Sequence, residues 1–260
     1  MQDELRLALI QTDLAWQDAD TNRALLEQRL HPLAGQVDLI ILPEMFTSAF
    51  AMGSGAIAEP QPGPTQAWMQ QQARTLGTAL TGSIAVMQDE KRYNRLFFVT
   101  PEGDVHSYDK RHLFRMLGED KRYAAGKDKL IVNFRGWRIL PLVCYDLRFP
   151  VFCRSTTTDP WDLMLVVANW PAPRAQHWRV LLQARAIENL GYVAGVNRIG
   201  RDGNGLDYAG GSVVVDPQGN ELLQAGSVEG DYCTSISRAA LQGWRQRFPA
   251  WMDADAFMLR

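Results

Sequence analysis

The chain has 260 residues and a formal net charge of −2, with 46% hydrophobic and 22% charged residues. This composition is typical of a soluble globular protein, and the length is sufficient for one large domain. Because lysine and arginine are scattered along the chain rather than clustered, the sequence does not indicate a nucleic-acid-binding protein.

The pattern of apolar residues and cysteines argues against a membrane protein or a secreted one. The longest apolar run, residues 163–168, is far too short to cross a bilayer. The first residues open acidic and then alternate as in a strand, which is not the pattern of a secretory signal. The three cysteines include no CxxC pair, so we predict neither a disulfide framework nor a zinc ribbon. We therefore expect a cytoplasmic protein without a metal.

Strand-like and helix-like segments alternate along the chain without repeats, low-complexity tracts or long linkers, so we expect a single domain over residues 1–260. In the first half, the hydrophobic pattern predicts strands at 5–13 and 37–42, and helices at 20–34 and 65–76. The second of these helices is expected to end at Gly77.

The second half of the chain continues the alternation. Two hairpins are predicted at about 95–109 and 129–146, where turn residues separate apolar runs. A buried strand at 162–169 precedes a long helix at 173–190, which is expected to face inward through Trp178, Leu181 and Leu182 and to stop at Gly191. The last predicted strands lie at 192–197, at 211–216 and around Cys233.

Continuous apolar strands, hairpins and few but long helices together predict an α/β protein built as a layered sandwich. Residues from about 238 onward form a C-terminal extension, which we expect to pack on the core or on a neighbouring subunit.

Three apolar strands each deliver one ionisable residue at their exit. Glu44 follows "DLIILP", Lys110 follows "DVHSYD" and Cys144 follows "WRILPLV". Ligands of layered α/β proteins tend to bind at such strand ends. Each residue alone also fits a structural role, because Glu44 could open a loop, Lys110 could lie in an exposed turn and Cys144 could fill the core.

The three residue types nevertheless form a chemical set. A thiol attacks as a thiolate, and a nearby carboxylate can take its proton. The negative charge that develops on an attacked carbonyl can be stabilised by an ammonium group and a backbone N–H. The set therefore suffices for covalent acyl transfer without histidine.

A histidine-based or metal-based site is the alternative. A Cys144–His112 pair stays open at this point, although nothing singles it out among His31, His106, His112 and His177. A metal site lacks the usual short-spaced ligand pairs, because its members would be Cys144, Cys153, His106 and His112. For Cys153 and Cys233 a structural role is expected.

Several motifs resemble the carbon–nitrogen hydrolase (nitrilase) superfamily. The segments "LPEMF", "YDKRHLF" and "LPLVCYDLRFP" carry the resemblance, and "ARAIENLGYVAGVNRIG" and "GGSVVVDPQGN" extend it to about residues 5–237. The resemblance implies a four-layer α-β-β-α sandwich, usually dimerised through helices, and catalysis without a cofactor. It implies a homodimer or higher homo-oligomer that binds no nucleic acid and no membrane.

The resemblance also implies roles for particular residues. Glu44 corresponds to the general base, Cys144 to the nucleophile and Lys110 to the oxyanion partner. The backbone N–H of Tyr145 is the second oxyanion donor, and Glu119 is the best match for a supporting second glutamate.

Within the superfamily, the segments "LVVANWPAPRAQHW" and "RFPAWMDADAF" are most similar to bacterial omega-amidases. These enzymes hydrolyse the terminal amide of 2-oxoglutaramate and 2-oxosuccinamate. The loop after Asn169 differs from that of the animal omega-amidases. The resemblance therefore does not define the choice among related substrates. The alternatives are an N-carbamoyl or deaminated-peptide amidase of the same superfamily, and a non-catalytic thiol sensor on the same fold.

Four residues are predicted to bind the substrate. Arg148 stands four positions after the nucleophile, and its planar guanidinium suits the far carboxylate of a 2-oxo acid amide. A salt bridge from Arg148 to Asp146 or to another acidic residue is the structural alternative. Phe50 is expected to form an apolar wall, and Asn169 and Trp170 complete the set.

Overall fold

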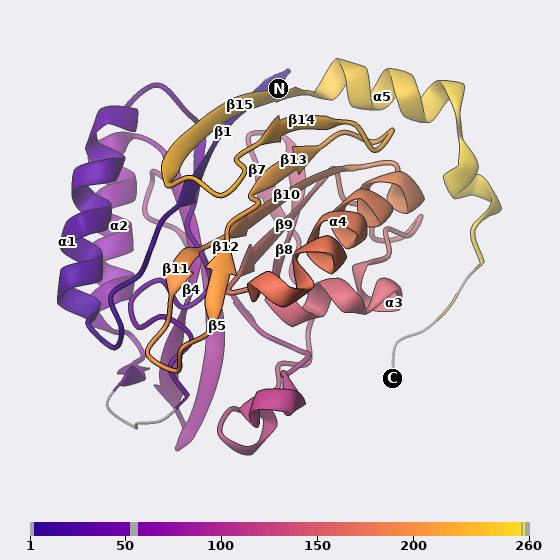
Figure 1. Cartoon of the computed structure of the whole chain (residues 1–260). Coiled ribbons are helices and arrows are strands. Elements are labelled where there is room, and N and C mark those ends of the chain that lie inside the picture. The colour runs from indigo at the N-terminus through magenta and orange to yellow at the C-terminus, as the bar shows by residue number, and fades with distance from the viewer. Residues whose placement is uncertain (1–2, 53–56, 256, 258–260) are drawn as a thin grey trace.

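The computed structural model describes residues 3–52, 57–255 and 257. Two β-sheets pack face to face, and helices cover their two outer faces (Figure 1). The predicted four-layer α-β-β-α sandwich is therefore confirmed. No described helix is both long and apolar enough to cross a membrane.

The first sheet contains the N-terminal strands and one strand from the C-terminal part of the chain. Its order is β15 (Gly230–Ser237), β1 (Glu4–Gln11), β2 (Leu39–Ile41), β4 (Ala79–Gln88), β5 (Lys91–Val99) and β6 (Val105–Asp109), with the short β3 (Glu59–Pro60) paired to β4. Strands β1, β2 and β4 run parallel, whereas β15 pairs antiparallel with β1 and places Cys233 opposite Ala8. The first predicted hairpin is the β5–β6 pair.

The second sheet is built from the middle of the chain. Its order is β14 (Glu221–Gln224), β13 (Val213–Val215), β10 (Tyr192–Asn197), β9 (Leu163–Ala168), β8 (Trp137–Val143) and β7 (Val132–Phe134). Strands β8, β9 and β10 are parallel, and the second predicted hairpin is the β7–β8 pair. A separate hairpin of β11 (Ile199–Arg201) and β12 (Asp207–Ala209) follows β10.

The largest apolar core lies between the two sheets. Leu7 and Leu9 of β1 enter it from the first sheet, and Leu165 and Val167 of β9 enter it from the second. Burial of these side chains contributes most of the free energy that holds the sheets together, at roughly 25 cal/mol per Å² of apolar surface. The carboxyl ends of the parallel strands consequently meet at one edge of the sandwich, where a site can form.

Helices close the sandwich on both sides. On the first sheet, α1 (Ala19–Leu30) and α2 (Pro64–Leu76) pack through side chains that include Leu26 and Met69. On the second sheet, α4 (Ala175–Asn189) packs through Trp178 and Leu182, as predicted.

The predicted helix ends are correct for α2 and wrong by one residue for α4. Helix α2 ends at Gly77, which adopts the left-handed conformation with a φ of 62°. In α4 the left-handed residue is Leu190, with a φ of 49°, and not Gly191. Gly191 is required for packing instead, because a Cβ atom there would lie 2.4 Å from the Trp161 ring.

The C-terminal segment begins with α5 (Arg238–Arg247), which rests on the body of the same chain (Figure 1). Leu241 of α5 is buried, and Arg245 bonds to Asp162 at 2.8 Å and to the main-chain oxygens of Trp161 and Leu190. The short 3₁₀ helix η7 (Ala250–Asp253) follows, and exposes Trp251.

Candidate active site

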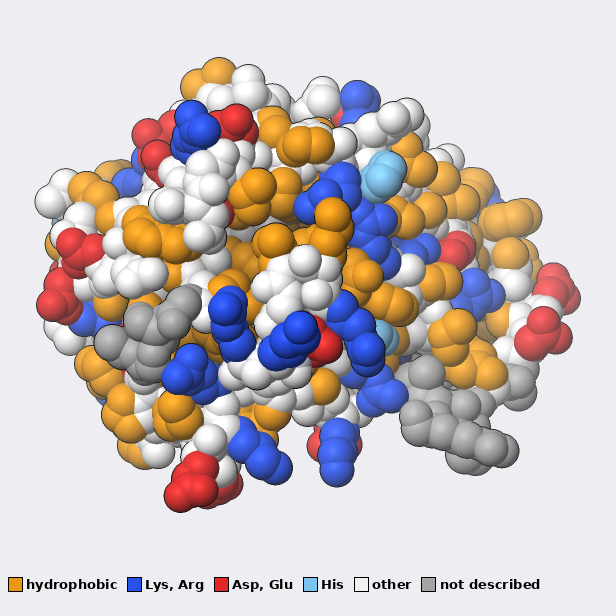
Figure 2. Space-filling view, turned by 60° about the horizontal axis from the view of Figure 1, so that its bottom comes forward, with side chains coloured by type: hydrophobic (Ala, Val, Ile, Leu, Met, Phe, Trp, Pro, Cys, Tyr) orange, Lys and Arg blue, Asp and Glu red, His pale blue; other side chains and the backbone are white. Residues whose placement is uncertain are grey.

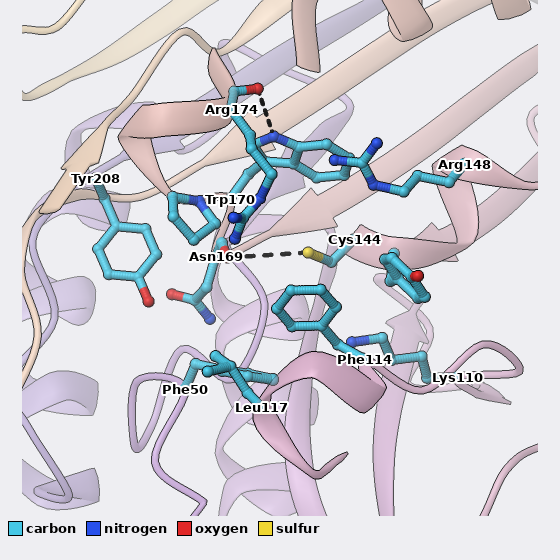
Figure 3. Close-up of a pocket in the computed structure, with 12 residues that line it drawn as sticks. Phe50, Lys110, Phe114, Leu117, Cys144, Arg148, Asn169, Trp170, Arg174 and Tyr208 are labelled. Atoms are coloured by element: carbon cyan, nitrogen blue, oxygen red, sulfur yellow. Dashed lines mark hydrogen bonds between the residues drawn. The ribbon is translucent and has the colours of Figure 1, made fainter. Parts of the chain in front are cut away.

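The three residues predicted from strand ends lie together in the structure. Glu44 follows β2 and Lys110 follows β6 in the first sheet, whereas Cys144 follows β8 in the second. Lys110 Nζ lies 2.9 Å from Glu44 Oε1, and Lys110 and Cys144 line the same pocket (Figure 3). The site is therefore assembled from both sheets at the edge where their strands end.

Cys144 occupies an unusual backbone conformation. It is the first residue of the 3₁₀ helix η5 (Cys144–Arg148), and its φ is 47°, in the left-handed region. For a residue with a side chain this conformation costs about 1–2 kcal/mol. The sharp turn directly after β8 lets the sulfur project into the pocket, where Sγ lies 3.9 Å from the main-chain oxygen of Asn169 (Figure 3).

The environment of Cys144 favours the protonated thiol. Burial raises the pKa of the thiol well above its ordinary value, and the carboxylate of Glu44 raises it further. The ammonium group of Lys110 opposes this shift without cancelling it. A thiol in this environment can act as a nucleophile only with a base that takes its proton.

Lys110 is enclosed between two carboxylates rather than exposed in a turn. Its side chain is 1% exposed, and Nζ lies 2.9 Å from Glu44 Oε1 and 2.9 Å from Glu119 Oε2. Although burial opposes the charge on Lys110, Glu119 and Glu44 together raise the pKa of its ammonium group. Lys110 is consequently a permanent cation in this site.

Glu119 opens the 3₁₀ helix η4 (Glu119–Lys121) and is fully buried. Burial raises the pKa of Glu119, and Glu44 adds to this effect against the opposing charge of Lys110. Its second oxygen accepts a hydrogen bond of 2.6 Å from the backbone N–H of Phe114. Glu119 thus fixes Lys110 from the side opposite to Glu44.

Asn94 belongs to this network, although the sequence did not point to it. It lies on β5, and its Nδ2 donates to Glu44 Oε1 at 2.8 Å and to Glu119 Oε1 at 3.3 Å. The only signal for it in the sequence is an amide inside an otherwise buried strand, which is common in proteins. Asn94 links the two carboxylates and limits the orientations that Glu44 can adopt.

Asn169 connects the two sheets at the site. Its backbone N–H donates to Glu44 Oε2 at 2.8 Å, and its Nδ2 donates to the Glu44 main-chain oxygen at 2.7 Å. The other atom of this amide group, Oδ1, is buried and has no hydrogen-bond partner among the described residues. Asn169 also lines the pocket (Figure 3).

The pocket encloses about 380 Å³, counting its open mouth. Its walls are largely aromatic and apolar, and Lys110 Nζ lies 5.3 Å from the ring centre of Phe50. The lining residues, ten of them labelled in Figure 3, are Phe50, Lys110, Phe114, Leu117, Cys144, Tyr145, Arg148, Asn169, Trp170, Pro171, Arg174 and Tyr208. All four residues predicted to bind the substrate are therefore located at the pocket.

Arg148 does not form the alternative salt bridge with Asp146. The Asp146 carboxylate instead accepts hydrogen bonds from the Tyr108 hydroxyl at 2.8 Å and from the backbone N–H of His112 at 2.9 Å. The guanidinium of Arg148 lies over the Trp170 ring at 4.6 Å and donates to His177 Nδ1 at 3.3 Å.

The contacts of His112 indicate a structural role. Its Nδ1 lies 2.8 Å from Asp146 Oδ1, and its ring stacks on Phe149 with 3.8 Å between the ring centres. Within the described part of the chain, no hydrogen bond joins His112 to Cys144. Nor do the described residues form a group of three or more His, Cys, Asp or Glu side chains that could hold a metal ion.

The site and the fold define a class of enzyme, and comparison with known families names it. Residues 6–246 match the carbon–nitrogen hydrolase family, so the chain belongs to this family. The predicted superfamily is thereby confirmed, as is the prediction of a hydrolase that acts on carbon–nitrogen bonds.

Individual relatives are similar over nearly the whole chain. The chain is 48% identical to "Omega-amidase YafV" of Escherichia coli strain K12 over 98% of both chains. It is 30% identical to the "2-oxoglutaramate amidase" of Bacillus subtilis strain 168, covering 95% of this chain and 96% of the relative. A crystal structure of a carbon–nitrogen hydrolase superfamily protein from Xanthomonas campestris, with an arsenic adduct in its active site, matches with a TM-score of 0.96 and 51% identity over 100% of both chains.

Proposed function

We propose that this protein is an omega-amidase, which hydrolyses the terminal amide of 2-oxoglutaramate and 2-oxosuccinamate to the acid and ammonia. The observation that carries the proposal is the thiol of Cys144 placed beside the Glu44–Lys110–Glu119 network in a pocket that also presents cationic side chains. The names of the two relatives, at 48% and 30% identity, support the same substrates.

In the first half of the proposed reaction, Glu44 takes the proton of Cys144 while Sγ attacks the amide carbon. The oxygen becomes negative and is stabilised by Lys110 and by the backbone N–H of Tyr145. Lys110 Nζ has three donors and lies within hydrogen-bond distance of three carboxylate oxygens, Glu44 Oε1 and both oxygens of Glu119, which hold it in place. Its contribution to the oxyanion is therefore the positive charge. The N–H of Tyr145 is available because the first N–H groups of a helix have no partner within that helix.

The carbon–nitrogen bond then breaks as Glu44 returns the proton to the nitrogen, so ammonia leaves and a thioester remains on Cys144. In the second half, Glu44 takes a proton from water, and the resulting hydroxide attacks the thioester carbon. The carbon–sulfur bond breaks, and the proton on Glu44 restores the thiol. Asn94 and the Asn169 backbone keep Glu44 oriented through both steps.

The pocket residues supply substrate recognition. Asn169 Oδ1, buried and without a described partner, is suited to accept an N–H of the substrate amide. Phe50 and Trp170 line the path of the short carbon chain, and Arg148 binds the far carboxylate. Steady release of ammonia from 2-oxoglutaramate tests the proposal, with N-carbamoyl compounds and deaminated peptides as competitors. Modification of the thiol without turnover would favour a thiol sensor instead.

Replacing Arg148 by lysine tests its role in binding the carboxylate. We expect Arg148→Lys to raise KM for 2-oxoglutaramate by about 30- to 150-fold, equivalent to about 2–3 kcal/mol, because lysine cannot form two parallel hydrogen bonds. A neutral amide of similar length should be affected much less. Initial rates over a range of concentrations of both substrates measure the difference. An equal rise in KM for both substrates would mean that Arg148 supports the loop and does not bind the carboxylate.

We further propose that the protein is a cytoplasmic homodimer or higher oligomer. Three free thiols suit a reducing compartment. On the outer face of α4, Val180 and Ile187 are 53% and 52% exposed, and Trp251 and Met252 add exposed apolar surface in the C-terminal segment. Such surfaces often mark contacts between proteins.

Light scattering measures the oligomeric state directly. We expect a species of at least about twice the 29.3 kDa of the chain at micromolar concentration. The double replacement Val180→Glu/Ile187→Glu should shift it toward the monomer, because charges on a buried contact face are costly to desolvate. A stable monomer of the unaltered protein would contradict the proposal.

A further inference from the structure

Arg174 is a second guanidinium in the pocket, and the sequence did not point to it. It ends the 3₁₀ helix η6 (Ala172–Arg174), directly before α4. Figure 3 shows its side chain reaching into the pocket near Asn169, and its guanidinium carbon lies 5.4 Å from the ring centre of Phe114. The main-chain oxygen of Arg174 accepts a hydrogen bond of 2.8 Å from Trp170 Nε1, so the backbone of this turn is held independently of the side chain.

The positive charge of Arg148 and Arg174 is not neutralised. Among the described residues, no carboxylate pairs with either guanidinium. Among the buried carboxylates of this region, Glu44 and Glu119 are engaged by Lys110, and Asp146 accepts from Tyr108 and His112. Burial lowers the pKa of Arg148, and Arg174 lowers it further, which shows that the two cations are close enough to repel each other. A partly buried pair of unneutralised guanidinium groups is suited to bind an anion.

The surface next to the pocket is basic as well. Figure 2, which brings the lower end of Figure 1 forward, shows Lys and Arg side chains gathered over the middle of one face and most Asp and Glu toward its edges. The segment 111–127, which supplies Phe114 and Leu117 to the pocket, contributes the exposed Arg115, Lys121 and Arg122. A field of this sign favours the approach of an anionic substrate over a neutral one.

We propose that Arg174 and Arg148 together read the carboxylate and the adjacent 2-oxo group of the substrate, and thereby reject free glutamine and asparagine. This inference rests on the proposed function. A guanidinium only donates hydrogen bonds, so it can bind a carboxylate and a carbonyl oxygen, but never an ammonium group. Glutamine differs from 2-oxoglutaramate only at carbon 2, where it carries an ammonium group that the two arginines would repel.

Glutamine and asparagine carry the same scissile amide group as their 2-oxo counterparts. The positive charge at carbon 2 is therefore the feature by which the two arginines exclude them.

The experiment compares Arg174→Met with Arg179→Met, in the full-length protein. Arg179 lies on α4, which begins directly after Arg174, and pairs with Glu221 at 2.6 Å on the exposed side, so its replacement controls for the loss of one positive charge. Ammonia release is measured from 2-oxoglutaramate, from the monoamide of glutaric acid, from neutral pentanamide and from glutamine. Arg174→Lys is the conservative variant, and the melting temperature of each variant checks its folding.

We expect Arg174→Met to lower kcat/KM for 2-oxoglutaramate by about 30-fold or more, mainly through KM, and that for pentanamide by less than about threefold. For the glutaric acid monoamide, which lacks the 2-oxo group, kcat/KM should fall by a smaller factor than for 2-oxoglutaramate. The preference for 2-oxoglutaramate over glutamine should narrow by about tenfold or more, because one repelling charge is gone. The kcat/KM of Arg174→Lys should lie between that of the unaltered protein and that of Arg174→Met. The kcat/KM of Arg179→Met should equal that of the unaltered protein.

Two results would overturn the inference alone: unchanged kinetics of Arg174→Met on 2-oxoglutaramate, or an equal loss on the charged and the neutral amides. The second result would assign Arg174 to the support of the loop. An unaltered protein that releases no ammonia from 2-oxoglutaramate would instead overturn the proposed function, and this inference with it.

Discussion

Replacement of Cys144 by alanine is expected to abolish ammonia release while leaving the protein folded. The variant has no sulfur to form the thioester, and loss of a catalytic nucleophile commonly costs about 10⁴-fold or more in kcat. The cost in stability should be only about 1–2 kcal/mol, because the side chain is small and partly buried at the pocket wall. Steady-state ammonia assays and urea denaturation measure the two effects separately.

Cys144→Ser should be nearly as inactive, because a hydroxyl is a far weaker nucleophile beside a carboxylate base. The matched control is Cys233→Ser, since Cys233 lies exposed on β15 in the outer part of the first sheet. That variant should keep full activity. Mass spectrometry after treatment with an electrophilic substrate analogue should find the adduct on Cys144. Appreciable turnover by either Cys144 variant would rule out a covalent mechanism through this residue.

Lys110→Met is expected to lower kcat by about 100-fold or more, because it removes the charge that stabilises the oxyanion. It should also destabilise the fold, by about 3–5 kcal/mol near neutral pH, since two buried carboxylates would then face each other unpaired. Lys121→Met, at an exposed position of η4, is the control for the loss of a lysine from the same segment, and should change neither property.

The loss of stability in Lys110→Met should depend on pH in a defined direction. The pKa of Glu119 is already raised by burial and by Glu44, and it must rise further without the ammonium group. A carboxyl group whose pKa is higher in the folded state favours folding most below its unfolded pKa, about 4.3, and this contribution is lost as the pH rises through the folded value. Urea denaturation at pH 5.5 and pH 8 should therefore find the variant less stable, relative to the unaltered protein, at pH 8. No change with pH would contradict a buried ion network.

The three predicted catalytic residues that the structure brings together share one property, namely that each ends an apolar run. Glu44, Lys110 and Cys144 are visible because buried strands end at them, and parallel strands bring their ends to the same edge. The strand β4 was missed for the opposite reason. It lies inside the first sheet but contains Thr81, Gly82 and Ser83, which interrupt the apolar pattern. Gly82 is needed there because a Cβ atom would lie 2.9 Å from the Leu42 and Phe46 side chains.

The residues that were missed depend on partners far away in the chain. Asn94 matters because it bonds to Glu44, 50 positions earlier, and nothing adjacent to it in the sequence reveals this. Arg174 stands in a short segment typical of an exposed helix start, and only the folded chain directs it into the pocket. Arg148 was predicted to line the pocket. That it contacts Trp170 and His177 and not Asp146 can be seen only in the folded structure.

The division of the proposed catalytic groups between the two sheets makes the site depend on how the sheets pack. The proposed base and cation, Glu44 and Lys110, come from one half of the sandwich, and the sulfur of Cys144 comes from the other. Neither sheet alone holds both the thiol and the carboxylate, so the set is complete only where the two sheets pack against each other. Asn169, which follows β9 in the second sheet, joins the two parts through its bonds to Glu44. We therefore expect a change in the apolar layer between the sheets, far from the pocket, to alter the separation of Cys144 and Glu44 and so to lower the activity.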